Sequence, residues 1–100
     1  MASTLHIIVA EGLTSERREV CHELIKEHAE EWWHQMPDVW IAGGLSAATW
    51  RDHLTPDIRG TGASVMVFRL PPDRTGWAYF GIKADERLAW LHERYVPTAT

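Results

Sequence analysis

Ten residues near the middle of the chain, Trp32–Ile41, constrain the fold more than any other stretch. They hold three of the six tryptophans, between a charged pattern of helical period and the pair Gly43-Gly44. Each large aromatic side chain has about 150–250 Å² of surface to bury, so a segment this rich in them belongs in a core. We predict that the stretch joins the end of a helix to a central strand over residues 38–42.

The length and composition predict one domain over residues 1–100. A chain of this size buries roughly two thirds of the surface of its unfolded form, which suffices for a core without disulfides. The one cysteine, Cys21, sits at a helical position beside apolar neighbours and is predicted to be a buried thiol. No apolar run approaches the length of a membrane span and no signal-peptide pattern opens the chain, so we expect a cytoplasmic protein with no membrane partner.

A net charge of −4 argues against the broad basic surface that neutralises many phosphates. A nucleic-acid role would need a local patch. Trp77 and Tyr79 lie near Arg69 and Arg74 and could form a small platform on which a base stacks. Aromatic residues at strand spacing also occur in cores, and that alternative stays open.

Alternating and helical patterns give an expected order of seven elements. Thr14 or Ser15 would cap the first helix, Ser46 the second, and Pro56 would end the second. The expected strands cover residues 5–10, 38–42, 64–70 and 77–82, and the expected helices cover 15–31, 47–54 and 85–95.

This order, β-α-β-α-β-β-α, predicts an α+β ferredoxin-like sandwich of the βαββαβ type, an antiparallel sheet with helices on one face. The strands over 5–10, 64–70 and 77–82 are apolar on both faces. A face without helices would therefore expose a large apolar patch, and we expect a homodimer that buries it, with His6 able to meet that face. The alternative is that the third helix and the loops cover it within one chain.

The first helix carries two stripes of residues spaced at three and four. Its predicted inner stripe is Val20, Cys21, Leu24, Ile25, His28 and Trp32. Its outer stripe is acidic: Glu16, Glu19, Glu23, Glu27 and Glu30. The acidic stripe is either a solvated face, relieved by Arg17, Arg18 and Lys26, or a docking surface for a basic protein partner.

A family resemblance rests on aromatic and polar spacings that run from about residue 4 to residue 95. The residues that carry it are Trp32-Trp33-His34, Trp40-Ile41, Ser46-Ala47, Arg51-Asp52, Leu54, Pro56, Trp77-Ala78, Gly81 and Trp90-Leu91. The chain resembles small bacterial proteins often labelled SinR-like, which are similar in fold to the CRISPR-associated endoribonuclease of the spacer-adaptation complex. The resemblance implies a ferredoxin-like fold and a dimer.

The resemblance also implies one chemical position. In the CRISPR nuclease an aspartate ends the first strand, and the matching residue here is Glu11, preceded by Ala10 where the family has an aromatic residue. Two such carboxylates across a dimer would hold Mg²⁺ or Mn²⁺ for phosphodiester cleavage. Glu11 is thus the candidate catalytic and metal-binding residue of a metal-dependent nuclease or nucleotide-binding protein.

Three functions follow from these patterns. The first is a homodimeric interaction or scaffold module without catalysis, the second is the nuclease that uses Glu11, and the third is an acidic partner-mimic or inhibitor that acts through the face from Glu16 to Glu30. His34 beside the tryptophan pair is expected to hydrogen-bond a backbone group beneath an aromatic side chain. No other histidine lies at a diagnostic spacing for a metal or a general base.

Overall fold

Four strands and two helices make up residues 4–70, the part of the chain that this computed structural model describes. These residues belong to the first of two compact units into which the chain divides after Leu70. The strand predicted over 77–82 and the helix over 85–95 lie outside the described residues, and the single domain over 1–100 stays a prediction. The elements are β1 (Leu5–Glu11), α1 (Ser15–His28), β2 (Glu31–Met36), β3 (Val39–Gly43), α2 (Ala47–Ile58) and β4 (Ser64–Arg69).

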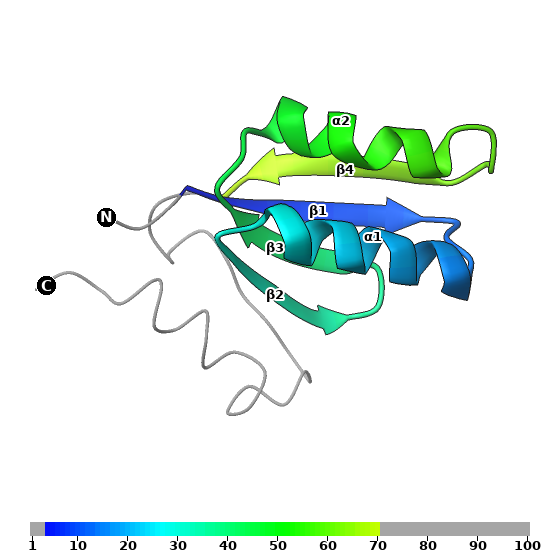
Figure 1. Cartoon of the computed structure of the whole chain (residues 1–100), viewed down its shortest axis with the longest axis horizontal. Helices are drawn as coiled ribbons and strands as arrows, with labels where there is room; N and C mark the ends of the chain where they lie inside the picture. The colour runs from blue at the N-terminus through cyan, green and yellow to red at the C-terminus, as the bar shows by residue number, and fades with distance from the viewer. Residues whose placement is uncertain (1–3, 71–100) are drawn as a thin grey trace, which may run out of the picture. The chain divides into compact units, whose positions relative to one another are not determined.

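The strands form one antiparallel sheet in the order β2-β3-β1-β4. β1 pairs with β3 on one side and with β4 on the other, and β3 also pairs with β2. α1 and α2 lie against the same face of this sheet, α2 over β4 and α1 over the centre (Figure 1). The predicted α+β class with an antiparallel sheet and helices on one face is confirmed for the described residues.

The tryptophan-rich stretch is a β-hairpin, so the predicted helix end over it is wrong. Trp32 and Trp33 lie in β2 and pair with Ala42 and Ile41 of β3. Pro37 and Asp38 form the turn, where the fixed φ of proline is favourable, and they lead into β3, which is the predicted central strand shifted by one residue, Val39–Gly43 rather than 38–42. Neighbouring bulky aromatic side chains fit a pleated surface better than a helix, and this preference outweighed the helical spacing.

α1 begins as predicted and ends three residues early, at His28 rather than residue 31. Thr14 is the cap, because its Oγ1 accepts a hydrogen bond from the N–H of Arg17 at 3.1 Å. Of the predicted inner stripe, Cys21 and Ile25 are fully buried, whereas Val20 and His28 are exposed and Trp32 belongs to β2. The buried side of α1 is therefore narrower than its apolar composition suggested.

Pro56 does not end α2, which continues to Ile58. Proline lacks the N–H that would bond to the residue four earlier, but the loss falls in the last turn. The N–H of Arg59 still donates to the carbonyl of Thr55 at 2.9 Å, which closes the helix after the proline. Ser46 caps the start as predicted, accepting from the N–H of Thr49 at 3.1 Å.

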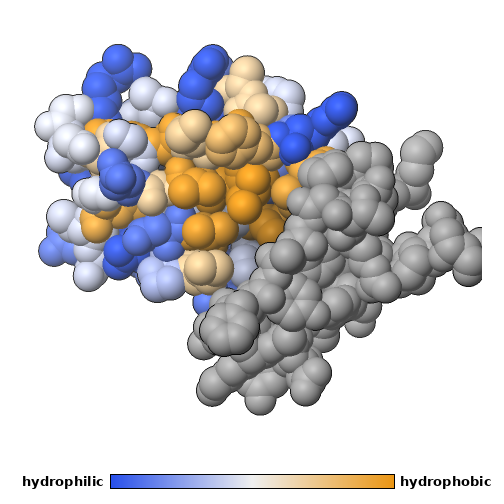
Figure 2. All heavy atoms as spheres, turned by 180° about the vertical axis from the view of Figure 1, so that it is seen from behind, coloured by the Kyte–Doolittle hydropathy of each residue, from blue (hydrophilic) through white to orange (hydrophobic). Residues whose placement is uncertain are grey.

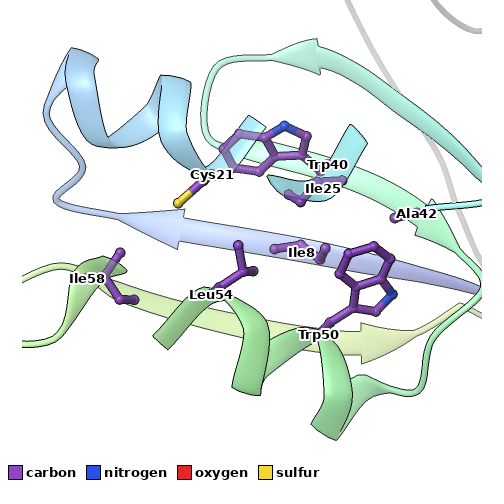
Figure 3. Close-up of a cluster of buried hydrophobic side chains, with 8 residues drawn as sticks. All are labelled: Ile8, Cys21, Ile25, Trp40, Ala42, Trp50, Leu54 and Ile58. Atoms are coloured by element: carbon purple, nitrogen blue, oxygen red, sulfur yellow. The ribbon is translucent and has the colours of Figure 1, made fainter. Parts of the chain in front are cut away.

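The core lies between the sheet and the two helices (Figure 3). Ile8 of β1 lies between Ile25 of α1 and Leu54 of α2, and the indole ring of Trp50 lies beside it (Figure 3). Ile8, Ile25, Trp40, Trp50 and Leu54 are almost completely buried. Burial of this kind contributes about 1.5–3 kcal/mol per large apolar side chain.

The opposite face of the sheet is also apolar, as its registers show. One row across all four strands pairs Phe68 with Ile7, Ile7 with Ile41, and Ile41 with Trp33. The next row is Met66, Val9, Val39 and Met36. Hydrophobic residues gather in a continuous patch on the side of the molecule seen from behind (Figure 2).

Shortening a side chain of this core tests the packing of α1. We expect Ile25→Ala to lower the free energy of unfolding by about 2–5 kcal/mol, because the cavity cannot collapse fully. Val20→Ala on the exposed side of the same helix should change it by less than about 0.5 kcal/mol. Urea unfolding of both variants measures the difference, and equal losses would contradict this placement of α1.

Candidate functional site

Glu11 lies at the end of β1 and is exposed to solvent. It pairs in register with Ser64 of β4 and precedes Gly12, whose φ of +80° suits glycine. By the alternation along β1 it belongs to the same face as Ile7 and Val9. No group of three or more metal-ligating side chains occurs within residues 4–70. A metal at Glu11 would thus need ligands from elsewhere.

The acidic stripe of α1 forms the rim of a shallow apolar groove. Four of the five predicted residues line it together with Val20 and Leu24, and the fifth, Glu30, lies beyond the helix end in a different pocket. The lining between the carboxylates is mostly apolar, and Val20, 40% exposed, is part of it. The glutamates of the groove are Glu16, Glu19, Glu23 and Glu27.

Only part of the predicted charge compensation exists on this face. Lys26 pairs with Glu23 at 3.6 Å, one turn along the helix. Arg18 is directed elsewhere, because its Nε donates to Asp38 Oδ1 at 2.9 Å and so ties α1 to the β2–β3 turn. The groove therefore keeps a strongly negative rim.

A cluster of two histidines and two tryptophans joins α1 to the hairpin, and the sequence did not reveal it as a unit. The ring of His34 stacks on Trp40 at 4.5 Å between centroids, and its Nδ1 lies 3.0 Å from the carbonyl oxygen of Val39. This confirms the predicted backbone contact of His34. His22 contacts the edge of Trp32 and accepts a hydrogen bond from Trp40 Nε1 at 3.2 Å.

His6 lies on the helix side of the sheet, so the expectation that it meets the open face is wrong. Even-numbered residues of β1 such as Ile8 face the helices, and His6 follows this alternation. It is buried, and its Nδ1 has no hydrogen-bond partner among the residues that the structure describes. Trp50 Nε1 is a second buried nitrogen of this kind.

The predicted stacking platform is only partly described. Arg69 ends β4, at the opposite end of the sheet from Glu11, and pairs in register with His6. Arg74, Trp77 and Tyr79 lie outside the described residues. Cys21 is buried as predicted, and burial raises the pKa of its thiol.

Comparison with models of known protein families and with curated proteins gives no match for this chain. Neither helix within residues 4–70 has the length and apolarity needed to cross a membrane.

The His22 cluster predicts a pH dependence of stability. Burial lowers the pKa of His22 below its ordinary 6.5, and the nearby His34 and Lys26 lower it further against the opposing Glu19 and Glu23. Just below pH 6.5 the unfolded chain therefore binds more protons than the folded chain. The stabilisation is complete above pH 6.5 and is lost as the pH falls through the folded pKa.

We expect the free energy of unfolding in urea to fall between about pH 7.5 and 5.5, and to fall less steeply in His22→Gln. Glutamine keeps an acceptor for Trp40 and does not titrate. Burial also lowers the pKa of His6, so some slope should remain in the variant. An identical slope in the variant and the wild type would contradict the role of His22.

Proposed function

We propose that this protein is a small cytoplasmic homodimer, a non-catalytic interaction module whose open sheet face joins the two copies. One observation carries the proposal: two adjacent rows of apolar side chains cross all four strands on the face without described helices. The exposed members of these rows are Met66, Phe68, Met36 and Val9, at 59%, 50%, 40% and 36%, whereas Ile41 and Trp33 are only 5% exposed, so the patch offered to a second copy is the exposed set.

Such a patch has a physical cost when water covers it. Burying apolar surface contributes about 25 cal/mol per Å², and contiguous exposed patches above a few hundred Å² mark interaction sites. Methionine and aromatic side chains are also enriched at interfaces between proteins. A second copy offers the same residues in a self-complementary arrangement, which suits a two-fold axis.

We further propose a ferredoxin-like fold and a relationship to the SinR-like and CRISPR-associated endoribonuclease-like proteins. The described residues follow the order β-α-β-β-α-β along the chain. In the sheet, β3 lies between β1 and β2, the two strands that α1 connects, which supports the split strand-helix-strand arrangement of that class. A packing through the open face would also bring Glu11 of each copy onto the shared side. Metal-dependent cleavage by a pair of Glu11 carboxylates stays a prediction of the resemblance.

A charge placed on the open face tests the dimer. We expect the wild type to have twice the 11.4 kDa mass of one chain by light scattering after gel filtration at micromolar concentration. Phe68→Lys should be monomeric, because a buried unpaired ammonium would oppose the contact. Val20→Lys makes a similar change on the exposed side of α1 and should stay dimeric. A monomeric wild type, or a dimeric Phe68→Lys protein, would contradict the proposal.

A second candidate function uses the acidic groove on α1. A basic amphipathic helix fits it, with apolar residues against Val20 and Leu24 and lysines or arginines against the four glutamates. The chain would then act as an acidic partner-mimic or inhibitor of a basic protein. The exposed apolar floor favours this over a purely solvated face, since a solvated helix face needs no apolar stripe.

Charge reversal at the groove tests this candidate. We expect a synthetic amphipathic peptide with lysines flanking a leucine stripe to bind the wild type, with an affinity that falls as salt rises. Glu19→Lys with Glu23→Lys should weaken binding at least about tenfold, whereas Glu11→Lys, at an exposed carboxylate outside the groove, should not. Glu11→Lys makes half the charge change of the double variant, so a loss of binding free energy half as large in Glu11→Lys would show attraction to net charge alone and would exclude a groove site.

A further inference from the structure

Two histidines from different helices meet where α1 and α2 lie against the same face of the sheet (Figure 1). His28 is the last residue of α1, and His53 lies in the middle of α2. Their rings are stacked, with centroids 4.1 Å apart and planes inclined by 27°. His28 is exposed and His53 is half-buried, and neither lines the acidic groove. This histidine pair is therefore open to solvent and separate from both surfaces considered above.

The ring nitrogens of the histidine pair are free for a ligand. Neither ring forms a hydrogen bond or an ion pair with any residue that the structure describes; the stacking is their contact. His22 and His34 also lie ring against ring, at 4.8 Å, but there one nitrogen of each ring is in use. Nδ1 of His22 accepts from the Trp40 indole, and Nδ1 of His34 lies 3.0 Å from a backbone carbonyl oxygen. Only the first of these two pairs keeps the nitrogens of both rings available.

The charge around the histidine pair favours a cation. His28 stands at the C-terminus of α1, where the aligned peptide dipoles leave a partial negative charge. Lys26, the other basic residue of the last turn, pairs with Glu23 of the acidic groove at 3.6 Å. The net charge of the chain is −4. A cation bound between the two rings thus meets the negative end of a helix in an acidic protein.

We propose that His28 and His53 bind a divalent transition metal ion of the Zn²⁺, Ni²⁺ and Cu²⁺ class. Neutral imidazole is a ligand that suits these ions. A Zn–N distance of about 2.0–2.1 Å places two nitrogens on a tetrahedral ion roughly 3.3 Å apart. Rings with centroids 4.1 Å apart reach this separation when they turn from stacked to converging. His28 is exposed at a helix end, and exposed side chains change rotamer within picoseconds to nanoseconds.

Two protein ligands define the kind of metal site. No group of three or more metal-ligating side chains occurs within the described residues 4–70, so a four-coordinate ion keeps positions for water or another donor. Structural zinc sites have four protein ligands, and a site with two binds more weakly and exchanges its ion. Because the two ligands come from different helices, the ion binds the folded chain and stabilises the packing of α1 beside α2 by mass action.

Isothermal titration calorimetry of the full chain with Zn²⁺, without a histidine tag, tests the proposal. We expect saturable binding that His28→Phe and His53→Phe each weaken at least about tenfold, because groups that only orient metal ligands already contribute about 10–100-fold to affinity. Phenylalanine keeps a flat ring for the stack and has no nitrogen, so the change separates ligation from packing. Mg²⁺ prefers oxygen ligands and should not compete with Zn²⁺.

His22→Gln is the matched control, because His22 also contacts a second imidazole but has its Nδ1 in a hydrogen bond. It should bind Zn²⁺ with wild-type affinity. Zn²⁺ should also raise the urea midpoint of the wild type and leave that of His28→Phe unchanged. The proposal is overturned if the wild type shows no saturable binding of Zn²⁺, or if either phenylalanine variant keeps wild-type affinity. It is also overturned if His22→Gln weakens binding as much as they do.

Discussion

The central position of β1 is the constraint on which the rest of the described structure depends. It is paired on both edges and its residues alternate between two faces, so each face must be compatible with what covers it. Ile8 faces the helices and completes the core with Trp40 and Trp50, whereas Ile7 and Val9 face the other way. Moving the register by one residue would exchange the two faces and bring His6 to the open side.

The sequence predicted much of this architecture, since the strand from Leu5 and the helix from Ser15 follow from their apolar periods. The hairpin over Glu31–Gly43 was missed for a physical reason. Trp32 lies at helical spacing from Ile25 and His28, but its pleated pairing with Ala42 depends on a partner strand that no local pattern reveals. Pro56 was expected to end α2, but the free energy that a proline costs a helix depends on its position within that helix.

The candidate sites also include features that could be predicted from the sequence and features that could not. The acidic rim was predictable because spacings of three and four place residues on one side of a helix, and four of the five glutamates do line one groove. The ion pair of Arg18 with Asp38 was not predictable. It joins residues 20 positions apart in the sequence, and only the packing of α1 beside the β2–β3 turn brings them together.

The apolar face of the sheet is the feature that most directly links this fold to a function. The most direct measurement uses a mixture of chains with ¹³C-labelled methionine methyl groups and unlabelled chains, and records nuclear Overhauser effects between them. We expect contacts from the methyl groups of Met36 and Met66 to protons of the second copy. Contacts of those methyl groups to protons of their own chain alone would contradict the dimer.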